Sequence, residues 1–163
     1  MDDVLTNLSD NARVWIYQAN KKLSPAAQKS MLEKAMHFVN NWSTHGTSLK
    51  AGAELLYDTF LVLSIDESDV IASGCSIDKS LHFIQQLEEE FDVNFLDRTT
   101  VAIWDNHEAS VMDLDAFRRQ INEGKIHKDS LIFNNLVRSK GEMSTEWKIP
   151  VNRSWLKKYL PAN

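Results

Sequence analysis

The chain has 163 residues, of which 43% are hydrophobic and 25% charged, and its net charge is −5. These values are ordinary for a soluble globular protein, and the length fits one domain, with a core over about residues 13–105 and an extension over about residues 106–163. The one cysteine excludes an internal disulfide and favours a reducing compartment. The first residues lack a signal-peptide pattern, and no apolar run reaches the roughly 18 residues that a membrane helix needs. We therefore expect a cytoplasmic protein that does not enter a membrane.

The charge is distributed unevenly along the chain. Residues 118–163 contain 10 Lys or Arg and 4 Asp or Glu, whereas residues 1–117 contain 8 and 19. A basic segment can bind nucleic acid or an acidic partner. Here, however, residues typical of packing, such as Trp147, Ile149 and Trp155, interrupt the basic ones. We therefore expect this segment to lie against the acidic part of the chain, and we do not expect nucleic acid as a partner.

The first half of the chain carries clear signals for a strand and a helix. Residues 13–18 (RVWIYQ) are rich in β-branched and aromatic residues and predict a central strand. Ser24 as N-cap and Pro25 at the first helical position predict the start of a helix. Its apolar face continues to about Trp42, and Gly46 is the predicted stop.

Two strands, a second helix and a further strand follow. Residues 49–57 and 60–65 predict strands, and the tight connection between them predicts an antiparallel hairpin. A helix with one apolar stripe follows Gly74, and residues 99–105 predict a fourth strand. The order β-α-β-β-α-β is that of the ferredoxin-like split βαβ fold, an antiparallel sheet with both helices on one face. We therefore predict an α+β protein with a ferredoxin-like core.

The extension predicts a short helix and a hairpin. Asp113 is placed to cap a helix that Gly124 ends. Residues 131–137 and 143–149 alternate between apolar and polar side chains, and the sequence Lys140-Gly141 lies between them. This pattern predicts two antiparallel strands joined by a turn at the glycine.

The predicted topology brings several polar residues to one end of the sheet. With right-handed crossovers, the start of the first strand, the end of the third and the start of the second helix all lie at that end. The residues that we expect there are Arg13, Thr44, His45, Lys50, Asp66, Glu67, Cys75, Ser76, Asp78, Asp105 and His107.

Cys75 is the most distinctive of these residues, because it lies where the second helix begins. Free amides and the helix dipole at such a start favour an anion, and a thiol there can become a nucleophile. In that reading His45 is the nearest base, with Asp66 or Glu67 able to orient it. In the simpler reading, Cys75 is a small buried residue and a neighbouring serine is an N-cap.

A binding site at this end involves more residues. The candidate ligand-binding set is Gly74, Cys75, Ser76, Asp78, Arg13, Trp42 and Trp104, where the two tryptophans end their elements and are placed to form the wall of a pocket. The five histidines show none of the close spacings of a zinc site, so we expect no metal, and no motif indicates a cofactor.

The segments RVWIYQANKKLS, WSTHG and IDES followed by SGCSIDKSLHFI resemble a family of small uncharacterised bacterial proteins. The resemblance extends to about Asp97, and members often carry the label ABC transporter ATPase, which implies ATP binding and hydrolysis. A phosphate-binding P-loop has the pattern G-x-x-x-x-G-K-[ST], in which backbone amides surround the phosphates. The nearest match, residues 74–80, lacks the second glycine and places Asp78 against the phosphates.

Three functions therefore stand as hypotheses. The first is a non-catalytic binding module that accepts an anionic group at the start of the second helix, with a small anionic ligand or another protein as its partner. The second is an enzyme that uses Cys75 with His45. The third is an ATP-binding protein linked to an ABC transporter, as the resemblance implies. Both a monomer and a homodimer fit the sequence.

Overall fold

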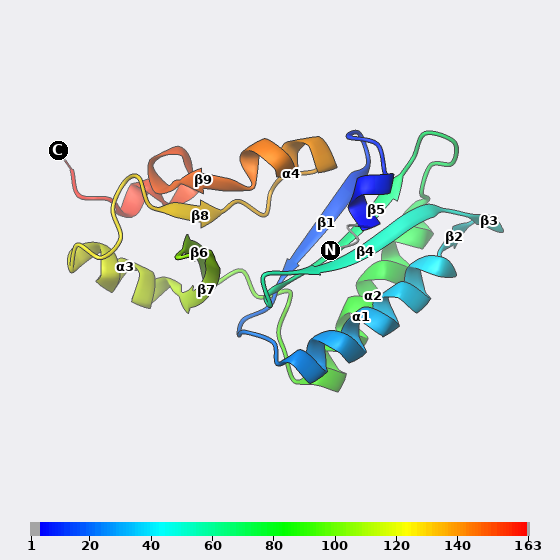
Figure 1. Ribbon diagram of the computed structural model, residues 1–163, viewed down its shortest axis with the longest axis horizontal. Coiled ribbons are helices and arrows are strands. Elements are labelled where there is room, and N and C mark those ends of the chain that lie inside the picture. The colour runs from blue at the N-terminus through cyan, green and yellow to red at the C-terminus, as the bar shows by residue number, and fades with distance from the viewer. Residues whose placement is uncertain (1–3, 163) are drawn as a thin grey trace.

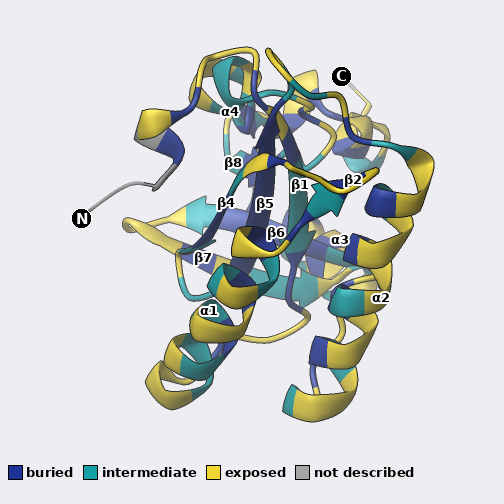
Figure 2. Cartoon of the chain, turned by 90° about the vertical axis from the view of Figure 1, so that its right-hand side faces the viewer, coloured by how far each residue is buried: buried dark blue, intermediate teal, exposed yellow. Residues whose placement is uncertain are grey.

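The computed structural model describes residues 4–162, apart from the side chains of Val4 and Thr6. After a short 3₁₀ helix, Val4–Asn7, the chain forms an antiparallel sheet from β1 (Arg13–Gln18), β5 (Phe60–Asp66) and β4 (Lys50–Leu56), in that spatial order. The prediction that residues 13–18 form a central strand is wrong, because β1 lies at an edge of this sheet and β5 lies between the other two strands. Every residue of β5 is buried, as Figure 2 shows.

Two helices cover one face of this sheet (Figure 1). Helix α1 (Pro25–Asn40) begins as predicted, because the Ser24 side chain accepts a hydrogen bond from the amide of Ala27. Helix α2 (Gly74–Phe91) begins in the same way after Ser73. The odd-numbered residues of β5, together with Met31 of α1 and Ile84 of α2, belong to one apolar core. The helices therefore bury the face on which alternate side chains of β5 project.

The predicted end of the first helix is wrong. Helix α1 ends at Asn40, and His45 and Gly46 form the turn between two short strands, β2 (Ser43–Thr44) and β3 (Thr47–Ser48). Both turn residues have positive φ, of 47° and 78°. Glycine adopts such angles without strain, so the signal at Gly46 was that of a hairpin turn and not of a helix C-cap.

The fourth predicted strand does not join the first sheet. β6 (Thr100–Asp105) lies in a second antiparallel sheet with β7 (Glu108–Asp113), β8 (Leu131–Phe133) and β9 (Lys148–Pro150), in the order β7-β6-β8-β9. The tight turn after β6 contains Asn106 and His107, both with positive φ, so the chain folds straight back and β7 pairs with β6 over its full length. The four-stranded ferredoxin-like sheet is therefore corrected to a three-stranded one.

The extension differs from its prediction in one further element. Helix α3 (Leu114–Asn122) forms as expected, with the Asp113 side chain accepting from the amide of Ala116. The predicted turn at Lys140-Gly141 is instead the start of helix α4 (Lys140–Glu146), with Ser139 as its N-cap. β8 and β9 do pair antiparallel, but α4 lies between them in the chain. Alternation in residues 143–149 was misleading, because the capping serine starts a helix there.

The two sheets pack on each other. Phe60 and Val62, on the even-numbered face of β5, share a core with Ala102, Phe133 and Trp147 of the C-terminal part. A third core, which includes Phe117 of α3 and Leu156 of the last 3₁₀ helix (Trp155–Tyr159), covers the far side of the second sheet. The basic extension thus packs against the acidic part, as predicted, mainly through apolar contacts.

A chain of hydrogen bonds also joins the two sheets. The indole of Trp147 donates to Asn135 (3.0 Å), the Asn135 amide donates to Gln18 (2.8 Å), and the Gln18 amide donates to the hydroxyl of Thr100 (3.1 Å). These bonds tie the end of β1 to the start of β6.

No helix within residues 4–162 has both the length and the apolar character needed to cross a membrane.

Candidate functional site

Asp66 ends β5 and is buried at the predicted polar end of the sheet. Its carboxylate accepts hydrogen bonds from the hydroxyl and the amide of Ser68 and from the amide of Ser9, and the Lys50 ammonium lies 3.8 Å away. The Ser68 bonds come first among the causes that hold the pKa of Asp66 well below its usual range. Asp66 is therefore a structural anion that organises the loop after β5.

The start of α2 is largely occupied by acceptors of the same chain. The amide of Ala72 donates to Glu67 (2.9 Å), the amide of Ser73 donates to the Thr44 hydroxyl (3.2 Å), and the amide of Ser76 donates to the Ser73 hydroxyl (3.2 Å). Within residues 4–162, only the amides of Gly74 and Cys75 remain without a partner in this turn. The predicted anion site is thus reduced to two donors.

Cys75 is exposed, which contradicts its reading as a small buried residue. His45 is also exposed, at the tip of the β2–β3 turn. In the part of the chain that the structure describes, no hydrogen bond joins the thiol to His45, and none joins His45 to Asp66 or Glu67. Glu67 instead pairs with Arg13, at 3.5 Å. The four residues proposed for catalysis therefore share one end of the sheet without forming a nucleophile–base arrangement.

Part of the predicted set lies elsewhere. Trp104 packs edge-on against Tyr57, with ring centroids 4.8 Å apart, and Tyr57 lies in the turn between β4 and β5. That turn is at the opposite end of the sheet from Asp66, so Trp104 does not form a wall near Cys75. Asp105 and His107 follow Trp104 to the same distant end. The prediction failed here because it placed β6 in the first sheet.

Two other expectations concern metal and phosphate. Among residues 4–162, no three His, Cys, Asp or Glu side chains gather in a way that could hold a metal ion. The segment compared with a P-loop, residues 74–80, is helical from its first residue. Its later amides therefore bond within α2 and do not form a loop around a phosphate. Asp78 is exposed on the first turns of this helix.

A groove of about 720 Å³ lies between α1 and α2. Its floor is aromatic, because Phe38 of α1 and Phe83 of α2 stack with centroids 4.5 Å apart and planes nearly parallel. Trp42 closes the end nearest Cys75, where its indole donates to the carbonyl of Ser76 (2.8 Å). Trp42 therefore lines this groove between the helices, whereas Cys75 does not line it.

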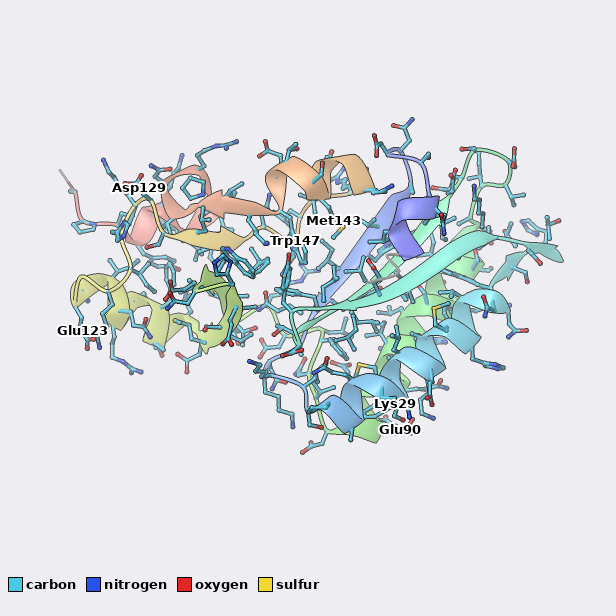
Figure 3. All side chains as sticks on the ribbon, viewed as in Figure 1. Lys29, Glu90, Glu123, Asp129, Met143 and Trp147 are labelled. Atoms are coloured by element: carbon cyan, nitrogen blue, oxygen red, sulfur yellow. The ribbon has the colours of Figure 1, made fainter. Side chains whose placement is uncertain are left out.

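Charged side chains form the rim of the groove. At the end of α2, Glu90 pairs with Lys34 of α1 at 3.0 Å, and Figure 3 shows Glu90 at this lower end of the helix pair. Lys79 lines the groove near the start of α2, and it makes no ion pair within the described residues. The sequence contained a signal for this site, since Lys79, Phe83 and Gln86 recur at helical spacing beside the buried stripe.

Comparison of the chain with family models, with curated protein sequences and with solved structures gives no match. The groove, the start of α2 and the chemistry of their side chains therefore carry the functional argument.

Proposed function

We propose that this protein is a non-catalytic binding module for a small amphiphilic ligand. The apolar part of the ligand lies on the aromatic floor between α1 and α2, and its anionic group lies towards Lys79, near the start of α2. The observation that carries the proposal is the groove itself, a concave site of about 720 Å³ with an aromatic floor and a charged rim. Small-molecule sites are typically concave and mostly apolar, with a few polar groups that orient the ligand.

The floor supports binding of an apolar group. Phe38 and Phe83 are only partly buried, so their stacked rings present aromatic surface to the groove. A ligand that covers this surface removes apolar area from water, which favours binding by about 25 cal/mol per Å² before the costs of association. Trp42 is buried at the end of the groove nearest Ser76 and donates a hydrogen bond to the Ser76 carbonyl, so this end of the site is already formed.

The rim gives the ligand a direction. Lys34 is neutralised by Glu90 at one end, whereas Lys79 at the other end has no acidic partner within residues 4–162. The two free amides of Gly74 and Cys75 begin the same helix, and the positive end of the helix dipole lies there. An anionic group is therefore favoured at the Lys79 end.

The other two hypotheses have less support. Cysteine catalysis needs a base within hydrogen-bond reach of the thiol, and His45 does not bond to Cys75. ATP binding through residues 74–80 needs a loop, but this segment is helical here.

We propose that β1, α1, β4, β5 and α2 form a ferredoxin-like unit that lacks its fourth strand. We also propose that the protein is cytoplasmic, because an exposed free cysteine suits a reducing compartment.

A dye with an aromatic body and a sulfonate, 8-anilinonaphthalene-1-sulfonate, is a suitable probe. Titration of the folded protein should give saturable blue-shifted fluorescence. Gln86 lines the groove and its neighbour Gln85 does not, although both are exposed on α2. Gln86→Phe should fill the groove and weaken binding strongly, whereas Gln85→Phe should bind the dye as the wild type does. Lys79→Gln should weaken binding by up to about fivefold, the most that an exposed ion pair usually contributes.

Two outcomes would count against the proposal. In one, fluorescence rises without saturation, as it does when a dye binds a loosened protein. In the other, the two phenylalanine variants bind the dye equally, so the dye lies outside the groove. Far-UV and near-UV circular dichroism of each variant should match the wild type before the titrations are compared.

A further inference from the structure

We propose that the outer edge of β1, with the cleft beside it, binds an extended peptide segment of a partner protein by strand addition. This site is separate from the α1–α2 groove. Its basis is the position that the fourth strand of the predicted sheet would have taken, since β6 lies in the second sheet and leaves this edge of β1 without a strand of the same sheet.

Backbone hydrogen bonds show which residues of β1 face outward. Just beyond β1, the amide of Ala19 donates to the carbonyl of Thr59, so odd-numbered residues bond towards β5. Even-numbered residues therefore direct their N–H and C=O groups to the outer edge, because these groups alternate along an antiparallel strand. The amide of Val14 fits this pattern, since it donates to the carbonyl of Arg138 outside the sheet (3.0 Å).

The edge is blocked at one end and open at the other. The segment around Ser139 bridges to Arg13 and covers the first residues of β1. Beyond it, the N–H and C=O of Ile16 have no hydrogen-bond partner within residues 4–162. Unpaired groups on a sheet edge are a template for another strand. The open part, up to Gln18, accommodates a segment of about four residues at the usual rise of 3.3 Å per residue.

The open edge forms one wall of a cleft of about 590 Å³, which Ile16, Tyr17 and Gln18 line. Three large apolar side chains also line it while exposed to solvent. They are Leu136 (76% exposed), Trp155 (49%) and Leu96 (40%). Half of the exposed large apolar residues of the described chain thus gather beside one open strand edge. Alternate apolar side chains of an added strand would cover them.

The charge around the cleft indicates the chemistry of the peptide. Arg98 lines the cleft, is exposed and has no ion pair within the described residues. The carboxylate of its neighbour Asp97 already accepts from the amide and the hydroxyl of Thr99. Lys158 lies over the Trp155 ring at 5.4 Å and adds a second cation. An acidic residue among the apolar ones therefore complements this surface.

The cleft is also formed in advance. Three of its residues, Gln18, Thr100 and Asn135, belong to the hydrogen-bond chain that joins the two sheets. That chain fixes β1 relative to the start of β6. A peptide therefore binds without paying for the ordering of the cleft, which favours affinity.

The test uses the full chain and three synthetic peptides, followed by ¹H–¹⁵N correlation spectra. The first peptide, acetyl-TVEVEVT-amide, alternates valine with glutamate. The second is the same peptide with its central backbone amides N-methylated, and the third carries lysine in place of glutamate. The first should bind saturably and shift the signals of Ile16, Tyr17 and the Trp155 indole. The second and third should each bind about five- to tenfold more weakly, as expected for losing a backbone hydrogen bond or a charge complement.

Variants of the protein locate the site. Ile16→Pro removes the outward N–H, a change that an edge strand tolerates. It should weaken binding of the first peptide by about the same factor as N-methylation of the peptide does. Leu136→Asp should weaken binding as well. Ile71→Asp is the matched control, because Ile71 is as exposed as Leu136 (74%) but does not line the cleft, and it should leave binding unchanged.

Three results would overturn the proposal. One is that the first peptide does not bind at millimolar concentration, and another is that its shifts map to α1 and α2. The third is that sedimentation shows a dimer which Leu136→Asp dissociates, because a second copy of the chain would then occupy the edge. None of these results decides whether the dye titration of the α1–α2 groove succeeds, so the two proposals can fail separately.

Discussion

Replacing Phe60 with alanine tests whether the two sheets are held together through the even-numbered face of β5. The Phe60 side chain is fully buried. The centroid of its ring lies 4.6 Å from the ring centroid of Phe133 and 5.0 Å from that of Trp147. Both neighbours belong to the C-terminal part of the chain. The substitution therefore removes the aromatic contact at the centre of the core that joins the two sheets.

The expected effect is large. Removing a fully buried phenylalanine lowers the free energy of unfolding by about 3–5 kcal/mol, through lost burial and the cavity that remains. A domain of this kind is stable by only about 5–15 kcal/mol, so the variant should lose a substantial share of its stability. With a urea dependence of about 2.5 kcal/mol per molar, the unfolding midpoint should fall by about 1–2 M.

Urea unfolding, followed by tryptophan fluorescence and by far-UV circular dichroism, measures the change. If the sheets unfold as one unit, both signals should move together to the lower midpoint. Phe91→Ala is the matched control, because Phe91 is only partly buried at the end of α2. It should lower stability by less than half as much, since less apolar area is lost from burial.

A loss below about 1 kcal/mol for Phe60→Ala would refute the packing argument, because a well-packed core cannot lose a whole ring so cheaply. Two separated unfolding transitions in the wild type would show that the two sheets do not unfold as one unit. In that case the contacts of Phe60 would not couple the unfolding of the first sheet to that of the second.

Three further predictions concern single side chains. Hydrogen bonds lower the pKa of Asp66 in the folded protein, so its contribution to stability is present above about pH 4, its pKa in the unfolded chain, and is lost as the pH falls further. The wild-type Tm should therefore drop more than that of Asp66→Asn between about pH 5 and pH 2. An equal drop in both proteins would show that this carboxylate is not coupled to folding. The buried hydroxyl of Thr59 has no hydrogen-bond partner within the described residues, so Thr59→Val should raise the free energy of unfolding by about 1–2 kcal/mol in urea, and a loss of stability would show that the hydroxyl is paired. Cys75 is exposed and does not bond to His45, so His45→Asn should leave the rate of iodoacetamide alkylation at neutral pH unchanged within about twofold, whereas a large decrease would restore the catalytic pair.

Local signals in the sequence were sufficient to predict several of the elements. Ser24, Ser73 and Asp113 each cap the helix that was predicted after them, because a cap and its first turn lie within four residues of one another. A strand was also predicted over residues 60–65, and β5 forms there, since its apolar run suits a strand that is covered on both faces. The polar end of the first sheet, with Asp66 and Glu67 beside the start of α2, followed from these elements and their connections.

The pairing of strands and the pockets between elements depend instead on contacts between distant parts of the chain. β6 is apolar enough to pair with β1, but β7 and β8 occupy both of its edges. The tight turn at Asn106 brings β7 to one edge, and β8 reaches the other edge from a distant part of the chain. Because β6 lies in the second sheet, Trp104 packs on Tyr57 and does not lie near Cys75. The α1–α2 groove and the open edge at Ile16 exist only once helices and sheets are packed, because each is lined by residues far apart in the chain.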